Sequence, residues 1–267
     1  VVAGNLTPDP ETGLGRWSPE AFRRALHEGR SRDGRLLYPA FPYAHTTLMP
    51  EADVDALHAH LRSLPPVHQA SRLHSLRFPY DTQAALAVWR LLNFKPGRFQ
   101  PDPAQSAEWN RGAYLVNGPA HCAACHSARD ALGGASAAFG ASDLPDGHWF
   151  APSLSDPRQA GVQLWSTERI VALLQQGSVD GATVMGPMAD VVFHSTQHLQ
   201  TDDLRAMATY LKARAEALRS QIASDPHSPA LFRVNGTVRN IPEFYEAFNI
   251  KPTDSLYLAP EKRVKIW

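Results

Sequence analysis

The stretch Cys122-Ala123-Ala124-Cys125-His126 contains both cysteines of this 267-residue chain. Two residues separate the cysteines, and a histidine directly follows the second one. This order is the pattern by which c-type haem is attached to protein. Two thiols spaced by about one helical turn can each form a thioether with a vinyl group of one haem, and the following imidazole can bind the iron. The sequence therefore predicts at least one covalent haem c, with His126 as an iron ligand.

Other uses of this cysteine pair fit the sequence less well. A structural zinc site usually needs four nitrogen or sulfur ligands, and the chain has no second cysteine pair to complete one. A thioredoxin-like redox pair lies near a βαβ unit, whereas the sequence around Cys122 and Cys125 does not alternate strand and helix. A simple disulfide gives no reason for His126 to follow. Haem attachment is the interpretation that uses all three residues.

Composition excludes several classes of partner. Hydrophobic residues make up 43% of the chain, and 26 Lys and Arg residues balance 26 Asp and Glu residues, so nothing indicates a nucleic-acid or other polyanionic partner. No run of about 18 apolar residues is present, and the sequence therefore predicts no transmembrane helix. The chain opens on Val1-Val2-Ala3-Gly4-Asn5 without a visible signal peptide. Because this opening reads like the middle of a domain, we expect the native N-terminus to be missing, together with any signal peptide.

The chain also repeats itself. Trp17-Ser18-x-Glu20 recurs as Trp165-Ser166-x-Glu168, 148 residues later. An ungapped match that crosses both loop and helix indicates two copies of one fold unit, of which the first begins too late to contain its own haem motif. Further identical pairs at this spacing are Ala3 and Ala151, Leu6 and Leu154, Gly13 and Gly161, Leu26 and Leu174, and Gly29 and Gly177, and at a spacing of 150 Asp53, Ala56 and Leu61 match Asp203, Ala206 and Leu211.

Apolar periodicity and capping residues predict a mainly α-helical protein. We expect two tandem cytochrome c-like helical domains, the first incomplete at its N-terminus, followed by a C-terminal appendage. The expected boundaries are residues 1–65 for the first domain, 66–105 for a linker with one helix, 106–220 for the haem domain and 221–267 for the tail. The expected helices cover about 18–27, 51–63, 82–93, 107–116, 166–176 and 201–220, and a glycine- and alanine-rich loop is expected over 131–152.

A c-type haem usually takes methionine or histidine as its second axial ligand. In the second repeat, Gly186-Pro187-Met188 is expected in a loop between two helices, from which a thioether can reach back over the porphyrin. Met185 is an alternative ligand, and Met188 is alternatively a core residue, as most methionines are. In the first repeat the corresponding loop, residues 39–43, has no methionine. Of the nearby candidates His45 and Met49, we favour His45 as the ligand of any iron bound there.

Several stretches of residues 1 to about 215 resemble one protein family. They are Asn5-Leu6-Thr7-Pro8-Asp9-Pro10-Glu11-Thr12-Gly13-Leu14-Gly15, residues 37–43, 99–103 and 108–115, the haem motif, and Gly186-Pro187-Met188-Ala189-Asp190-Val191-Val192. The family comprises the multi-haem cytochrome c subunits of membrane-associated bacterial dehydrogenases that act on alcohols, aldehydes, gluconate or nicotinate. The resemblance implies His126 as the proximal and Met188 as the distal iron ligand. Many members of the family have methionine where this chain has Phe41.

This resemblance implies an electron-transfer subunit that relays electrons from a periplasmic dehydrogenase to a quinone or terminal acceptor. Its expected partners are a dehydrogenase catalytic subunit and that acceptor, and we identify no catalytic site in the chain itself. Covalent haem c is normally attached outside the bacterial cytoplasm, so we expect the protein in the periplasm or at the periplasmic face of the inner membrane. Membrane association is expected only through partners or a missing segment.

The tail carries a second resemblance. Asp225-Pro226-His227-Ser228-Pro229 and Phe232-Arg233-Val234-Asn235-Gly236 are similar to the C-terminal end of neprilysin-type zinc metallopeptidases. This resemblance implies that His227 and Arg233 bind a substrate carbonyl and stabilise a developing oxyanion. The zinc motif of such enzymes is H-E-x-x-H, yet of the twelve histidines only His27 is followed by glutamate, and Ser31 stands where the second histidine is required. The alternative function is therefore a metallopeptidase fragment without its zinc site.

Overall fold

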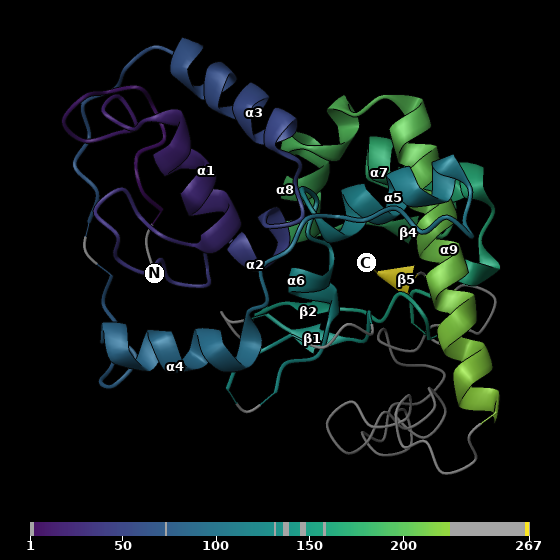
Figure 1. Cartoon of the computed structure of the whole chain (residues 1–267). Helices are drawn as coiled ribbons and strands as arrows, with labels where there is room; N and C mark the ends of the chain where they lie inside the picture. Colours follow the sequence, from purple (N-terminus) through teal and green to yellow (C-terminus); the bar gives the residue numbers. More distant parts are fainter. Residues whose placement is uncertain are drawn as a thin grey trace, which may run out of the picture. The chain divides into compact units, whose positions relative to one another are not determined.

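The computed structural model describes residues 3–72, 74–130, 132–135, 139–144, 148–156, 159–224 and 265–266 (Figure 1). The protein is mainly helical, as predicted, and it divides into two compact units. Unit 1 takes its residues from 1–103 and 117–121, and unit 2 takes its residues from 104–116 and 122–267. Among the described residues, no helix is both long and apolar enough to cross a bilayer.

Unit 1 is built around α1 (Pro19–Glu28), which packs against α2 (Tyr43–Thr46) and α3 (Glu51–Ser63). The segment predicted as a linker contains α4 (Gln83–Asn93). Arg90 of this helix donates a hydrogen bond of 2.6 Å to the carbonyl oxygen of Glu28 and places its guanidinium 4.9 Å from the ring of Tyr43. The segment therefore makes specific contacts with the rest of unit 1.

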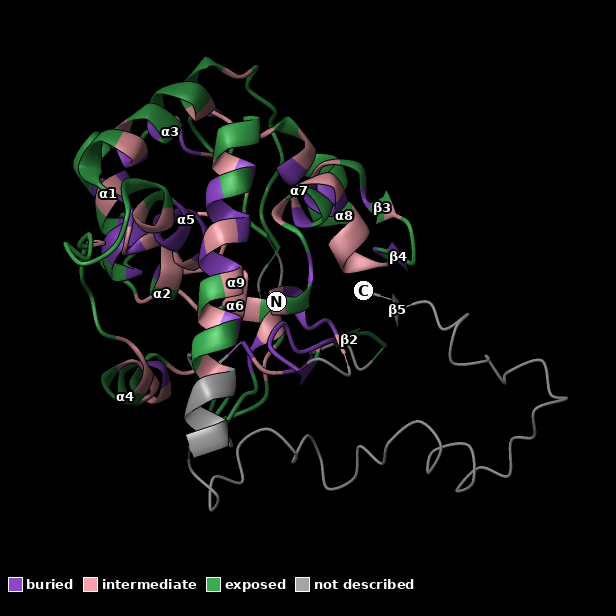
Figure 2. Ribbon diagram, turned by 90° about the vertical axis from the view of Figure 1, so that its right-hand side faces the viewer, coloured by how far each residue is buried: buried purple, intermediate pink, exposed green. Residues whose placement is uncertain are grey.

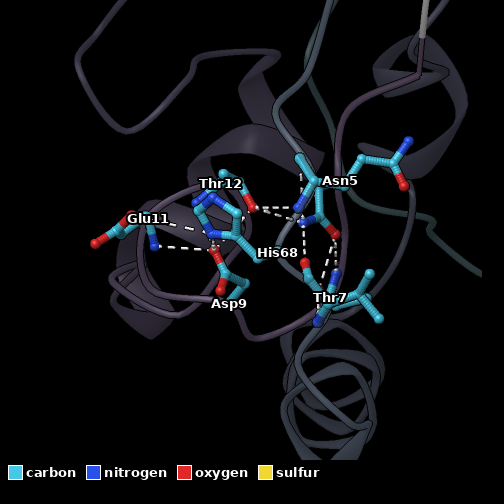
Figure 3. Close-up of polar contacts among 8 residues, drawn as sticks. Asn5, Thr7, Asp9, Glu11, Thr12 and His68 are labelled. Carbon is cyan, nitrogen blue, oxygen red and sulfur yellow. Dashed lines mark hydrogen bonds and ion pairs between the residues drawn. The ribbon is translucent and has the colours of Figure 1, made fainter.

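The loop that precedes α1 forms a polar network that also holds the chain after α3 (Figure 3). The side-chain amide of Asn5 donates to the carbonyl oxygen of Val67 at 2.8 Å and to Thr12 Oγ1 at 3.0 Å. The backbone N–H and the hydroxyl of Thr12 both donate to Asp9 Oδ1, each at 2.7 Å. These donors hold the pKa of Asp9 below its ordinary value, and His68, whose Nδ1 lies 3.5 Å from the same oxygen, adds to the effect.

The two copies of the repeat form helices with the same kind of ends. Ser18 caps α1 and Ser166 caps α7 (Thr167–Gln176), and each hydroxyl accepts a hydrogen bond of 3.1 Å from the backbone N–H three residues later. Both helices end at a glycine with a left-handed backbone, Gly29 with φ 59° and Gly177 with φ 75°. Glycine adopts this conformation without steric cost. The repeated residues are therefore those that start and stop equivalent helices.

Unit 2 combines helices with short β-pairs. β1 (Ser142–Asp143) pairs antiparallel with β2 (Phe150–Ala151), and β3 (Ser178–Val179) pairs antiparallel with β4 (Ala182–Thr183), which also pairs in parallel with β5 (Lys265–Ile266). The remaining elements are α5 (Ala107–Asn117), α6 (Ala123–His126), η1 (Val162–Leu164), α8 (Pro187–His194), η2 (Thr196–His198) and α9 (Thr201–Ser224).

The sequence did not predict the short elements. The loop expected over 131–152 contains β1 and β2, and α2, α6 and both 3₁₀ turns were also missed. The loop expected at 186–188 is wrong, because Met188 is the second residue of α8. Pro187 occupies the first helical position, where its missing N–H has no intrahelical partner to lose. A helix of eight residues is too short for a clear apolar period, whereas Pro at its start was a usable signal.

The core of unit 2 lies along one side of α9 (Figure 2). Leu204 of α9 has no exposed surface. Two residues later, the carbonyl oxygen of Ala206 lies very close to the backbone of α5. At Gly112 of α5, an added Cβ would lie 1.9 Å from that carbonyl oxygen. Beside this crossing, the guanidinium of Arg111 donates two hydrogen bonds of 2.7 and 2.8 Å to the carboxylate of Asp203. The close contact of α5 with α9 therefore requires glycine at position 112.

We expect Gly112→Ala to destabilise unit 2 by roughly 1–3 kcal/mol, the usual cost of overpacking, even though alanine favours helix more than glycine does. The midpoint of urea unfolding, followed by circular dichroism, measures this effect. Gly97→Ala is the matched control, because an added Cβ there meets no atom within 4 Å. An unfolding midpoint of Gly112→Ala equal to that of the unchanged protein would contradict the close helix crossing.

Candidate haem-binding site

The two cysteines and the histidine of the motif form one helical turn in unit 2. Cys122 precedes α6 with helical backbone angles, and its carbonyl oxygen accepts hydrogen bonds from the backbone N–H groups of Cys125 at 3.3 Å and His126 at 3.0 Å. Residues three apart on a helix project from the same face. Both thiols are free of disulfide bonds, with Cys122 partly buried and Cys125 exposed. This turn therefore presents two available thiols on one face, next to the imidazole.

The imidazole of His126 is fixed by a backbone carbonyl. Its Nδ1 lies 2.8 Å from the carbonyl oxygen of Pro152, so Nδ1 must carry the proton and donate it. Burial lowers the pKa of His126 and favours the neutral ring. In a neutral imidazole with Nδ1 protonated, Nε2 carries the lone pair that binds a metal. Pro152 thus sets both the ring orientation and the tautomer that iron ligation needs.

The surroundings of the cysteines do not favour the thiolate form in the absence of a bound group. Burial raises the pKa of the Cys122 thiol to about 12, and partial covering of the Cys125 sulfur, in a residue that is exposed overall, raises its pKa in the same direction. Zinc ligands and redox-active cysteines are thiolates, which form readily when the pKa is lowered. In addition, the described ranges contain no group of three or more His, Cys, Asp and Glu side chains that could hold a metal ion. The donor set is one imidazole and two thiols free of disulfide bonds, which fits haem c.

The residues after the motif also fit a bound group. Ser127 is fully buried, and its Oγ has no hydrogen-bond partner among the described residues. A buried hydroxyl normally finds a partner, so an orphaned one beside the motif is consistent with a ligand that belongs there. Arg129 then closes the turn, because its guanidinium donates a hydrogen bond of 2.7 Å to the carbonyl oxygen of Ala124. The chain that follows the motif thus holds it at Ala124 and at His126.

The structure places Met188 in the same unit as the motif, on the first turn of α8, with its side chain half-buried. Met185 lies between β4 and α8 and is 46% exposed. Gly186 caps α8 with a backbone (φ 52°, ψ −133°) that other residues adopt at a cost. Met188 is thus held by a helix start, whereas the alternative Met185 belongs to the preceding connection.

The candidates of the first repeat lie in unit 1, whose residues include no cysteine. His45 is in α2, its Nδ1 lies 3.0 Å from the carbonyl oxygen of Asn117, and its ring centroid lies 5.9 Å from that of His121. Met49 is a core residue that is 7% exposed, and its carbonyl oxygen bonds with the ring of His27 at 3.1 Å. The structure therefore supports a core role for Met49 and gives His45 a fixed Nδ1, as it does His126.

Sequence reasoning missed the role of Pro152, although a signal existed. Residues 151–154 correspond to residues 3–6 of the first repeat at the spacing of 148, so this stretch was already marked as part of the repeat. The contact itself joins residues 26 apart in sequence, which periodicity cannot reveal. The predicted tail residues His227 and Arg233 lie outside the described residues.

Comparison with known proteins gives two results. Residues 195–264 match the sequence family described as Peptidase family M13, in agreement with the resemblance of the tail. Most of the chain matches c-type cytochromes and dehydrogenase subunits instead. It is 44% identical over 216 residues to a subunit of the nicotinate dehydrogenase of Pseudomonas putida, covering 80% of this chain and 18% of that protein.

Two further relatives are cytochromes by name. The chain is 36% identical over 255 residues to the cytochrome c subunit of alcohol dehydrogenase (quinone) of Gluconacetobacter polyoxogenes, covering 91% of this chain and 54% of that subunit. It is 35% identical over 215 residues to a protein of Cereibacter sphaeroides described as diheme cytochrome c-type, covering 79% of this chain and 70% of the relative. The chain thus spans only about half, or less, of the two dehydrogenase relatives. Its sequence, its helical fold and its haem motif agree: the chain belongs to the family of c-type cytochromes that includes the cytochrome c subunits of bacterial dehydrogenases.

Proposed function

We propose that this chain is an electron-transfer protein that holds haem c through Cys122, Cys125 and His126, with Met188 as the second iron ligand. The hydrogen bond of 2.8 Å from His126 Nδ1 to the carbonyl oxygen of Pro152 is the observation that carries the proposal. It prepares Nε2 for iron on the same turn that presents both thiols. Family membership supports the same cofactor.

The residues of the chain have distinct tasks in this proposal. Haem c supplies an iron that gains or loses one electron. Cys122 and Cys125 tether the group covalently, and His126 holds its imidazole at a fixed orientation through Pro152. Met188 supplies a neutral thioether, which raises the reduction potential relative to a second histidine. The chain thereby sets the potential without taking part in substrate chemistry.

The architecture and partners are proposed from the relatives. We propose two tandem cytochrome c-like domains, the first incomplete and the second with the haem motif, followed by the tail. The relative from Gluconacetobacter is named a cytochrome c subunit of a quinone-dependent alcohol dehydrogenase. By extension, a dehydrogenase catalytic subunit reduces this chain, and a quinone or terminal acceptor oxidises it. We place this electron transfer in the periplasm or at the periplasmic face of the inner membrane. His45 is the ligand proposed for any haem of the first domain.

Peptidase activity is the second candidate, favoured by the match of residues 195–264 to Peptidase family M13. That match covers about a quarter of the chain, and the sequence has no H-E-x-x-H motif to bind the catalytic zinc and supply a base. The chain by itself therefore has the proposed oxyanion partners His227 and Arg233 without the metal they serve. We favour electron transfer, since the chain contains a candidate residue for each attachment point and each iron ligand of haem c.

The cysteine series tests the covalent attachment. With both cysteines intact, the red pigment should stay with the protein in acid acetone, and Cys122→Ser plus Cys125→Ser together should release it. Cys122→Ser alone should leave one vinyl group unreacted and move the band of the reduced pyridine haemochrome to longer wavelength. Ala123→Ser adds a hydroxyl between the cysteines and should change neither result. Release of all pigment from the unchanged protein would exclude haem c.

The methionine pair tests the second ligand. Met188→Leu keeps the side-chain volume but removes the thioether, so the reduction potential should fall and the weak red charge-transfer band of a methionine–ferric iron bond should disappear. Met185→Leu, at the exposed neighbouring methionine, should leave both unchanged. Absorbance spectra and redox titration measure the outcome. Loss of the band in Met185→Leu alone would assign the ligand to Met185.

A further inference from the structure

The segment Trp149–Pro152 contacts His126 and also Gly186, which precedes the proposed ligand Met188. At its end, the carbonyl oxygen of Pro152 holds Nδ1 of His126, the proximal imidazole. At its start, the ring of Trp149 lies against Gly186, the residue that caps α8 and precedes Met188 by two positions. Both contacts lie within unit 2. Four consecutive residues therefore connect the elements that carry both proposed axial ligands.

The contact between Trp149 and Gly186 is tight. A Cβ built on Gly186 would lie 2.6 Å from each of three indole carbons, Cδ2, Cε2 and Cζ2 of Trp149, far inside van der Waals distance. The ring thus lies directly on the backbone of the turn, in space that any side chain at position 186 would fill. Trp149 itself is 40% exposed, so one part of its ring covers Gly186 while another part faces solvent.

The position of Gly186 determines where the first turn of α8, and with it Met188, begins. The carbonyl oxygen of Gly186 accepts hydrogen bonds from the backbone N–H groups of Ala189 at 2.9 Å and Asp190 at 3.3 Å, which begin α8. Met188 lies inside this first turn. A shift of the Gly186 backbone therefore moves the methionine with it. Gly186 adopts backbone angles (φ 52°, ψ −133°) that glycine reaches readily and other residues do not, so this turn depends on glycine and can lie directly against the indole.

The segment is itself anchored. β2 pairs with β1 so that Phe150 lies opposite Asp143 and Ala151 opposite Ser142, and the N–H of Leu144 donates a hydrogen bond of 2.8 Å to the carbonyl oxygen of Trp149. The element α6, which carries the haem motif, also contacts β1. Trp149 therefore directly precedes a strand, β2, that is paired with β1, and β1 in turn contacts α6.

We propose that Trp149 is a positioning residue for the second iron ligand: its indole holds the Gly186 turn and thereby keeps Met188 in place to bind the iron. The proposal rests on the proposed function, in which Met188 binds the iron. It adds that one segment, Trp149–Pro152, fixes the proximal imidazole and the distal methionine together. An aromatic ring buries a large apolar area in such a contact, so its removal should loosen the Gly186 turn.

The test compares three variants of the haem-loaded protein. In Trp149→Ala, the red charge-transfer band should weaken, the reduction potential should fall, and added imidazole should bind the ferric protein about tenfold more tightly, the ratio that corresponds to about 1.4 kcal/mol. Trp149→Phe keeps a ring on Gly186 and should recover most of the band. Phe150→Ala removes the adjacent aromatic side chain, which is similarly exposed at 45%, and should match the unchanged protein.

The outcomes distinguish the role of Trp149 from the proposal that Met188 binds the iron. A band, a potential and an imidazole affinity that are unchanged in Trp149→Ala would overturn the role of Trp149 and leave the methionine ligand in place. Absence of the band from the unchanged protein would overturn Met188 as ligand, and this proposal with it. Equal losses in Phe150→Ala would also overturn the proposal, because general loosening of β2, and not the indole, would then be responsible.

Discussion

The hydrogen bond from His126 to the carbonyl oxygen of Pro152 is the constraint on which the site depends. An imidazole at the end of a short helix can rotate and can exchange its proton between two nitrogens. The carbonyl removes both freedoms, because it accepts from Nδ1 only and thereby leaves Nε2 as the metal-binding atom. The two thiols need no such partner, since the turn of α6 already places them on one face.

The fold supplies that carbonyl through a short backbone pairing that runs into buried residues. β1 and β2 are only two residues long each, yet they fix the residues that precede Pro152. Around them, the larger helices provide stability. α9 packs against α7 and receives α5 at Gly112, where no room exists for a side chain. The helical core and the small hairpin thus have separate tasks, one holding the unit together and the other orienting the ligands.

Repetition explains much of unit 1. The serine caps and the terminal glycines of α1 and α7 are the same residues at the same structural positions. The first repeat nevertheless has no cysteine pair in this chain. Its candidate ligand His45 has Nδ1 3.0 Å from the carbonyl oxygen of Asn117. Unit 1 therefore retains the helices of the repeat in a chain whose single haem motif belongs to unit 2.

Sequence alone pointed to the haem motif more readily than to the residues that support it. The haem motif, the long helices and the family were all accessible, because each depends on local spacing or periodicity. The start of α8 was misjudged as a loop, although Pro187 was a signal for it. The repeat marked the stretch that contains Pro152, but local spacing cannot reveal the contacts of Pro152 and Trp149, since these join residues 26 and 37 positions apart. The roles of His227 and Arg233 stay predictions, because both residues lie outside the described part of the chain.

The central claim is that this chain carries its haem through covalent bonds at one motif. The intact mass of the denatured protein, produced with haem-attachment machinery in the periplasm, tests it most directly. We expect a single species whose mass exceeds that of the polypeptide by one haem per chain. A denatured protein with the mass of the bare polypeptide would contradict the assignment of Cys122 and Cys125 and, with it, the electron-transfer function built on them.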